Sequence, residues 1–317
     1  MTETAGMMIG LDVGGTKIEA IALTGDGKAL WRRRVPAPKE YQGTVRVCAE
    51  LVRAAEQGTG RTGTVGVGLP GTISPGTGLV KNANSTWLIG HRLDQDLQEA
   101  LGRRVRLMND ANCFALSEAT DGAGAGGRVV FGVILGTGVG GGIVVDGRIL
   151  EGRQSIAGEW GHNPLPRRTA DERPGPACYC GREGCIETFL SGPGMERDHA
   201  SVSGACLTTR EIVVRAEAGE TQSAATLDRY TDRLGRALAG VVNILDPDVI
   251  VLGGGMSNLP GLAERAQAST APHVFTDIPS LSVLRHMHGD SSGVRGAAWL
   301  GADLRNPGRR GQDREGG

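Results

Sequence analysis

Short apolar runs, several of which end at glycine or proline, dominate the hydrophobic pattern of the chain. They cover residues 7–11, 18–23, 65–69, 105–108, 128–135 and 249–252. Runs of this length with such boundaries predict buried strands. Apolar residues at helical spacing instead predict a helix at residues 41–57, and further helices are expected at 111–119, 210–218, 226–244 and 294–304.

Two of the predicted strands run into glycine-threonine turns and then into a second strand. The first turn contains Asp12, Gly14, Gly15, Thr16 and Lys17, and the second contains Gly136, Thr137, Gly138, Gly140 and Gly141. Backbone N–H groups in such a turn can hold a phosphate group. Lys17 and the Thr16 hydroxyl add donors, and Asp12 is placed to hold hydrated magnesium. Two such hairpins suggest a duplicated core in which each half binds phosphate.

Other interpretations of these glycines remain open. The first hairpin could be an ordinary one with a Gly-Gly turn. The G-x-G-x-x-G spacing at 136, 138 and 141 is typical of dinucleotide sites, but that motif requires a helix where residues 141–149 predict strand and turn. The glycine run at 253–255 fits a nucleotide lying against bare backbone, or else a simple turn from strand to helix.

Half of the six cysteines fall within eight residues. Cys178, Cys180 and Cys185 follow His162, and three thiolates with one imidazole are the ligands of a closed tetrahedral zinc site. Such a zinc ion would be structural and would hold Glu159, His162 and Glu187 in place. The alternative is a set of buried cysteines without a metal. A disulfide is less expected, because the other cysteines are scattered and no secretory signal is present.

Polar residues between the two hairpins could face a substrate. The loop at 81–87 combines amides and hydroxyls with Trp87, a mixture that suits a sugar ring, although a solvated loop with a packing tryptophan is equally expected. Asn109 and Asp110 stand between a predicted strand and a predicted helix. Asp110 could be the N-cap of that helix, or it could accept a proton from a substrate hydroxyl that attacks a γ-phosphate.

Composition excludes several classes of function. The 317 residues include 34 basic and 35 acidic side chains, a balance that argues against a nucleic-acid or membrane partner. No apolar run reaches the roughly 18 residues of a membrane span, and no basic signal-peptide start is present, so we expect a cytoplasmic protein. Residues 167–177 are expected to form a surface loop, and residues 286–290 a polar loop rather than a second metal site. The charged residues 305–317 are expected to form a disordered tail.

Six motifs occur in an order that resembles the ROK family of bacterial sugar kinases and repressors. They are DVGGTK, NDANCFALSEA, GTGVGGG, GEWGH, CYCGREGCIE and DPDVIVLGGGMSN, and the resemblance extends from about residue 9 to about residue 300. Within the family, VKNANSTWL, GEWGHNPLP and HGDSSGVRGAAWL are most similar to the fructokinases, some of which are also called mannofructokinases.

The resemblance implies a two-domain α/β fold of the actin-like, ribonuclease H type, with a cleft between the domains. The smaller domain would comprise residues 1–118 and the C-terminal helix at 290–304, and the larger domain residues 119–289. The implied activity is ATP-dependent phosphorylation of a hexose at its 6-hydroxyl, with fructose as the expected sugar and mannose as a further one. N-acetylglucosamine kinase and glucokinase are the alternatives. A sugar-responsive transcriptional regulator is less expected, since only about eight residues precede the first strand, with no recognition helix.

The resemblance also implies a role for individual residues. Asp110 would be the general base, and the sugar would contact Asn84, Asn109, Asp110, Glu159, His162 and Glu187. ATP would contact Asp12, Gly14, Gly15, Thr16, Lys17, Thr137, Gly138, Gly140, Gly141, Gly254 and Gly255. Zn²⁺ would be bound by His162, Cys178, Cys180 and Cys185, with Mg²⁺ accompanying ATP. Relatives of this kind are commonly homodimers, so a homodimer is expected.

Overall fold

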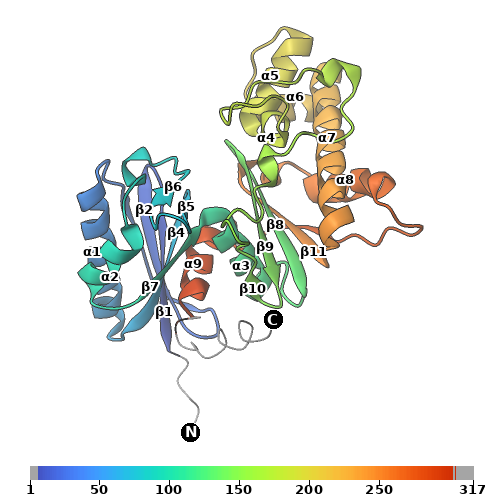
Figure 1. Cartoon of the computed structure of the whole chain (residues 1–317). Helices are drawn as coiled ribbons and strands as arrows, with labels where there is room; N and C mark the ends of the chain where they lie inside the picture. The colour runs from blue at the N-terminus through green and yellow to red at the C-terminus, as the bar shows by residue number, and fades with distance from the viewer. Residues whose placement is uncertain (1–5, 303, 305–317) are drawn as a thin grey trace. The chain divides into compact units, whose positions relative to one another are not determined.

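The computed structural model describes residues 6–302 and 304, and the chain forms two compact units (Figure 1). Unit 1 comprises the described residues up to Asp121, the segment Ile149–Ala157 and the described residues from Asp290 onward. Unit 2 comprises Gly122–Arg148 and Gly158–Gly289. Each unit contains a five-stranded sheet with helices packed against it.

The sheet of unit 1 has the strand order β3-β2-β1-β4-β7. Its strands are β1 (Met7–Val13), β2 (Lys17–Leu23), β3 (Ala29–Pro36), β4 (Gly63–Leu69) and β7 (Val105–Asn109). The first three strands pair antiparallel, whereas β4 pairs parallel with both β1 and β7. A small additional hairpin is formed by β5 (Thr72–Ile73) and β6 (Val80–Lys81).

Alternation along β1 assigns its side chains to two faces of the sheet. Ile9 and Leu11 belong to the core that includes the apolar faces of α1 (Tyr41–Thr59) and α2 (Leu93–Leu101). Met8 instead packs with Val294 of α9 (Ser292–Ala302). Asp12, two positions after Gly10, therefore lies on the α9 side of the sheet.

Glycines allow α9 to approach the sheet and α3 (Asp110–Asp121) closely. A methyl group on Gly10 would lie 2.1 Å from the Val294 carbonyl oxygen, and one on Gly66 would lie 2.0 Å from the Ala297 carbonyl oxygen. A methyl group on Gly296 would lie 1.6 Å from the Cys113 carbonyl oxygen. Any larger residue at these positions would therefore push α9 away from the strand that carries Asp12.

Unit 2 repeats the strand arrangement of unit 1. Its order is β10-β9-β8-β11-β12, with an antiparallel pair β8–β9 and parallel pairs β8–β11 and β11–β12. The strands are β8 (Val129–Leu135), β9 (Val139–Val145), β10 (Arg148–Ile149), β11 (Val249–Gly253) and β12 (Val283–Arg285). The helices are α4 (Ile186–Leu190), α5 (Gly192–Ser203), α6 (Thr209–Glu217), α7 (Thr221–Leu245) and α8 (Leu262–Thr270). The predicted duplication of hairpin-containing halves is confirmed, and the fold is an actin-like α/β fold.

The final helix begins at Ser292, two residues before the predicted start. The predicted disordered tail at 305–317 lies outside the described residues. Among the helices that the structure describes, none combines the length and hydrophobicity needed to cross a membrane.

The expected surface loop at 167–177 contains a buried charge. Glu172 is only 5% exposed, and its Oε1 accepts hydrogen bonds from Arg233 Nε at 2.8 Å and from Arg236 Nη2 at 2.7 Å. Both arginines lie on α7 and are themselves buried. Burial opposes ionisation of Glu172, but the bonds from Arg236 and Arg233 outweigh it and hold its pKa at about 2. The loop is therefore anchored to the longest helix of unit 2.

We predict that Glu172→Gln lowers the free energy of unfolding at pH 7 by up to roughly 3–5 kcal/mol, because it removes the carboxylate that two buried guanidinium groups share and leaves Arg233 with Asp198 and Arg236 with Asp232. Urea denaturation at several pH values would measure the effect. The low pKa of folded Glu172 stabilises the native state above the unfolded-state value of 4.5, and this contribution is lost as the pH falls toward about 2. The difference between variant and wild type should therefore shrink over that range.

The exposed Glu264 on α8 provides a matched control. Glu264→Gln should change the free energy of unfolding by less than about 0.5 kcal/mol. Equal effects of the two substitutions would show that the Glu172 cluster does not anchor the loop.

Candidate functional site

Backbone hydrogen bonds bring the cysteine-rich segment back onto His162. The Cys178 amide donates to the Arg182 carbonyl at 2.7 Å, so residues 178–182 form a tight turn. Gly181 and Gly184 have φ values of 85° and 68°, in the left-handed region that favours glycine. The Ile186 amide donates to the Asn163 carbonyl at 2.8 Å and so fixes Cys185 next to the segment that carries His162.

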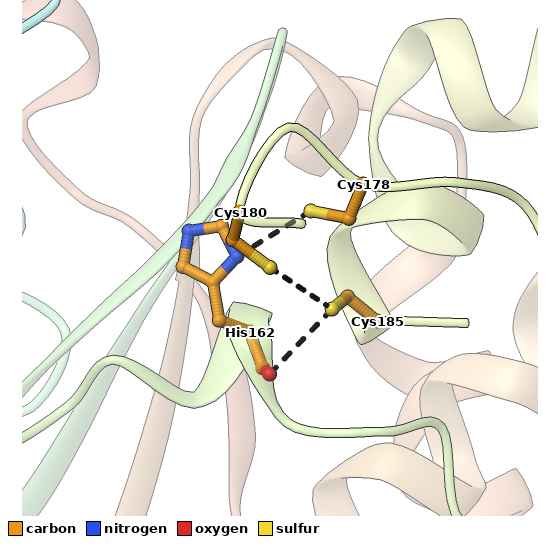
Figure 2. A group of neighbouring side chains, drawn as sticks. All are labelled: His162, Cys178, Cys180 and Cys185. Carbon is orange, nitrogen blue, oxygen red and sulfur yellow. Dashed lines mark hydrogen bonds between the residues drawn. The ribbon is translucent and has the colours of Figure 1, made fainter. Parts of the chain in front are cut away.

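The four predicted metal ligands meet at one point (Figure 2). Their ligand atoms all lie within 4.8 Å of one another, with 3.6 Å between the sulfur atoms of Cys180 and Cys185 and 3.6 Å between Cys178 Sγ and His162 Nδ1. A tetrahedral zinc ion with bonds of about 2.3 Å to sulfur requires ligand separations of about 3.8 Å. The residues present therefore fit a closed zinc site that uses Nδ1 of the histidine. Within residues 6–302 and 304, no second cluster of this kind occurs.

The thiols of the cluster differ in acidity before any metal binds. The Arg182 backbone amide lowers the pKa of Cys180. Burial, together with the neighbouring thiols of Cys180 and Cys178, raises the pKa of Cys185 to about 12. Metal binding must therefore displace a proton from Cys185, so metal affinity should decrease at low pH.

The second nitrogen of His162 contacts a residue that the sequence reasoning did not select. Nε2 of His162 lies 2.9 Å from the hydroxyl of Tyr179, and the two rings meet edge to face with centroids 5.1 Å apart. Tyr179 stands between two of the predicted zinc ligands, and its side chain is 81% exposed. The only signal for this contact in the sequence was the position of the tyrosine between two predicted zinc ligands.

Glu187 links the cysteine-rich segment to the second glycine turn. It lies in the first turn of α4, the helix that begins directly after Cys185. Its Oε2 accepts the backbone N–H of Val139 at 2.9 Å. A methyl group on Gly138 would lie 2.7 Å from the same oxygen atom. The glycine at this position therefore leaves room for the Glu187 carboxylate to hold the turn.

Glu159 is also held close to β9. The neighbouring Trp160 is buried, and its indole N–H donates to the Gly140 carbonyl at 2.9 Å. Gly158 and Gly141 approach so closely that a methyl group on Gly158 would lie 2.4 Å from the Gly141 carbonyl oxygen. The segment containing Glu159 and His162 thus packs against β9. Glu187 holds the turn at the N-terminal end of this same strand.

A pocket of about 520 Å³ lies beside the second glycine turn. It is lined by Gly136, Thr137, Gly192, Pro193, Thr209, Arg210, Val213, Val214, Gly255, Met256, Asn258, Leu259 and Pro260. Thr137 and Gly255 were predicted nucleotide contacts, whereas Gly254 packs against β8, where a methyl group would lie 2.3 Å from the Leu135 carbonyl oxygen.

The sequence reasoning missed the wall of the pocket that α6 contributes. The capping box of Thr208 and Glu211 marks the start of this helix in the sequence, but not its position beside the glycine turn.

In unit 1, three carboxylates gather near the first glycine turn. Burial, followed by the charges of Asp110 and Glu19, raises the pKa of Asp12 to about 7. Glu19 is the antiparallel partner of Asp12 in β2, is itself buried, and accepts a hydrogen bond from Arg34 Nε at 2.8 Å. The clustered carboxylates around Asp12 favour a bound cation, which would restore the ionised form of Asp12. In the turn itself, the Gly14 amide donates to the Lys17 carbonyl at 3.0 Å.

Asn109, and not Asp110, caps α3. Asn109 Oδ1 accepts the backbone N–H groups of Ala111 at 2.9 Å and of Asn112 at 3.3 Å, which is the N-cap arrangement. Asp110 is the first residue of the helix, and its Oδ1 accepts the Ala111 N–H at 2.8 Å. The cap therefore lies one residue earlier than the N-cap interpretation of Asp110 predicted, and the Asp110 carboxylate is oriented by the helix start.

The loop at 81–87 divides into packing and exposed residues. The Trp87 indole donates to Thr44 Oγ1 at 3.2 Å, so Trp87 packs on α1 as the alternative interpretation predicted. Asn84 is exposed, and its backbone N–H donates to the Pro70 carbonyl at 3.2 Å. The buried Ser85 beside it faces the first glycine turn, with its hydroxyl 3.5 Å from where a methyl group on Gly15 would lie.

The predicted site residues are thus divided between the two units. Unit 1 holds Asp12, Gly14, Gly15, Thr16, Lys17, Asn84, Asn109 and Asp110. Unit 2 holds Thr137, Gly138, Gly140, Gly141, Glu159, His162, Cys178, Cys180, Cys185, Glu187, Gly254 and Gly255.

Comparison with known proteins identifies relatives along nearly the whole chain. The model of the ROK family matches residues 8–303. An N-acetyl-D-glucosamine kinase from Yersinia enterocolitica is 38% identical over 299 residues, which cover 93% of this chain and 99% of that protein. The solved ROK hexokinase from Thermus thermophilus has a TM-score of 0.83 and 34% identity, covering 95% of this chain and 99% of that one. A ROK glucokinase from Streptomyces griseus, solved with glucose and AMPPNP, has a TM-score of 0.75 and 28% identity over 93% of this chain and 99% of its own.

We predict that the purified protein contains one zinc ion per chain and that Cys180→Ser loses it, because a hydroxyl is a poor replacement for a thiolate ligand. Elemental analysis of the dialysed proteins would measure the metal. Cys206→Ser is the matched control, because Cys206 is exposed and lies outside the cluster. Metal-free wild-type protein, or equal zinc content in all three proteins, would contradict the zinc assignment.

Proposed function

The chain belongs to the ROK family and is an ATP-dependent sugar kinase, and from this premise we propose that its sugar is N-acetyl-D-glucosamine, phosphorylated at the 6-hydroxyl. The similarity to N-acetyl-D-glucosamine kinase over 93% of this chain and 99% of the relative carries the proposal. It supports the alternative considered from the sequence over the expected fructokinase.

Asp110 is the proposed general base. Its carboxylate would accept the proton of the 6-hydroxyl while that oxygen attacks the γ-phosphorus of ATP. Two observations support this role: Asn109 supplies the helix cap, and the Ala111 amide orients the Asp110 carboxylate. The role of N-cap, which would have explained an aspartate here without catalysis, is already filled by another residue.

Asp12 and Lys17 are the proposed partners of the ATP phosphates in unit 1. Asp12 would hold the hydrated Mg²⁺ ion that accompanies ATP, and the ion would neutralise phosphate charge. The surroundings of Asp12 support this assignment: burial first, and then the charges of Asp110 and Glu19, raise its pKa, so a cation beside it would stabilise the ionised form. The positive charge of Lys17 lowers the pKa of Asp12. The Lys17 ammonium group would pair with phosphate oxygens.

In unit 2, the proposed contacts to the sugar ring come from Glu159, His162 and Glu187. Zinc bound to His162 and the three cysteines would supply structural rigidity, since four protein ligands leave no open position for activating water. With Nδ1 directed at the metal, His162 would meet the sugar through Nε2. Glu187 would contact the sugar with a carboxylate that also accepts the Val139 N–H of the phosphate-binding turn.

The pocket beside Thr137 and Gly255 is the proposed site of the adenosine moiety. Its volume of about 520 Å³ falls within the range of small-molecule sites, and apolar side chains such as Val213 and Met256 line it. Bare backbone at Gly136 and Gly255 lets a planar base or a phosphate approach without side chains in between. Arg210, at the start of α6, adds a positive charge at the pocket wall.

We predict that N-acetyl-D-glucosamine has the highest kcat/KM among hexoses tested with MgATP. A coupled assay with N-acetylglucosamine, glucose, mannose and fructose would measure it. A polar group that matches its partners in the site separates related substrates by about 1–3 kcal/mol or more, so we expect a preference of roughly tenfold or greater. A higher kcat/KM for fructose or glucose would overturn the proposed sugar and leave the kinase activity in place.

We predict that Asp110→Asn lowers kcat by about 10²–10⁴-fold and changes the KM for the sugar little, because the amide keeps the shape of the side chain but cannot accept the proton. Steady-state kinetics would separate the two parameters. Asp94→Asn is the matched control, because Asp94 also lies in the first turn of a helix, α2, and should leave kcat unchanged. Retention of more than about a tenth of wild-type kcat by Asp110→Asn would exclude a general base at this position.

A further inference from the structure

Tyr179 occupies an unusual position for an exposed aromatic residue. It lies in the turn between Cys178 and Cys180, and although its side chain is 81% exposed, its hydroxyl is placed 2.9 Å from His162 Nε2. The Tyr179 ring stands at 88° to the imidazole ring, with the centroids 5.1 Å apart. The hydroxyl thus contacts the one nitrogen of His162 that does not face the cysteine thiols.

The chemistry of His162 allows only one strong partner at that nitrogen. A neutral imidazole that uses the lone pair of Nδ1 as a ligand carries its single proton on Nε2. With zinc on Nδ1, that N–H would donate to one acceptor, and the Tyr179 hydroxyl oxygen lies at hydrogen-bonding distance from it. A sugar hydroxyl that binds His162 must therefore replace the tyrosine hydroxyl.

The surroundings of the Tyr179 hydroxyl are those proposed for a sugar hydroxyl. Glu159 and Glu187, which are proposed with His162 to contact the sugar ring, lie close enough to Tyr179 to interact with it electrostatically. A tyrosine phenol carries its proton at neutral pH, because its ordinary pKa is about 10. It therefore provides an O–H group among these side chains, as a sugar does.

We propose that the Tyr179 hydroxyl is a built-in substitute for a sugar hydroxyl, which keeps His162 Nε2 hydrogen-bonded until the sugar displaces it. This inference rests on the proposed function. Because the tyrosine ring is largely exposed, its departure sacrifices little packing, and the main cost is one hydrogen bond. Tyr179 thus weakens sugar binding by a modest factor and makes binding depend on a sugar hydroxyl that can take its place.

The test is to measure the Kd for N-acetylglucosamine by calorimetry, without ATP, in zinc-loaded wild-type protein and in Tyr179→Phe. Removing the competing hydroxyl should lower the Kd by about two- to tenfold, the typical net worth of one hydrogen bond. Zinc content should stay the same, since Phe retains the ring and the cysteines are unchanged. Tyr41→Phe is the matched control, because it removes a hydroxyl that bonds Asp96 in unit 1, and it should leave the Kd unchanged.

An NMR measurement of the His162 Nε2 proton gives a second readout. In sugar-free protein, its resonance should differ between wild type and Tyr179→Phe, and with sugar bound the two should coincide. An unchanged or higher Kd in Tyr179→Phe would overturn the inference and would indicate that Tyr179 contacts the sugar directly. Because these measurements need no ATP, wild-type protein that binds the sugar but transfers no phosphate would overturn only the proposed activity.

Discussion

The convergence of His162 and three cysteines on one point is the constraint on which the candidate sugar site of unit 2 depends. Because Cys185 immediately precedes α4, fixing this residue also fixes Glu187, whose carboxylate reaches the Val139 amide. Directing Nδ1 of His162 toward the thiols leaves Nε2 on the opposite side of the ring, where Tyr179 meets it. The His162 and cysteine cluster thereby orients the His162 ring and the Glu187 carboxylate, and through Glu187 it holds the second glycine turn.

The two units share a strand arrangement but differ in chemistry. In unit 1 the turn after β1 follows Asp12, whose pKa is raised by burial and then by the charges of Asp110 and Glu19. In unit 2 the corresponding turn after β8 is almost bare backbone, held by Glu187 and bordered by the pocket. One half is thus suited to a cation and to proton transfer, and the other to phosphate and nucleotide contacts. Duplication of the hairpin therefore provided two glycine turns whose proposed roles differ.

Buried charge also stabilises a segment that has no role in the site. Glu172 belongs to a polar, proline-containing loop, and its local sequence suggests only solvent exposure. In the structure its carboxylate is enclosed by Arg233 and Arg236, which lie more than sixty positions later on α7. Such long-range ion pairs cannot be predicted from hydrophobic periodicity, because neither charged residue changes the pattern of apolar and polar positions around it.

Local chemistry was readable from the sequence alone. Apolar runs followed closely by glycine turns predicted the two hairpins, and cysteine spacing predicted the composition of the His-Cys cluster, since both depend on residues close together in the chain. The tertiary structure decided what each polar side chain contacts. In the structure Asn109 caps α3, and Trp87 packs against α1. Glu172 is buried, the Tyr179 hydroxyl contacts His162, and α6 lines the pocket. These outcomes depend on how elements that are distant in the sequence pack together. A hydrogen bond or a pocket wall requires residues to be close in space, and the spacing of residues along the chain does not determine which distant residues meet.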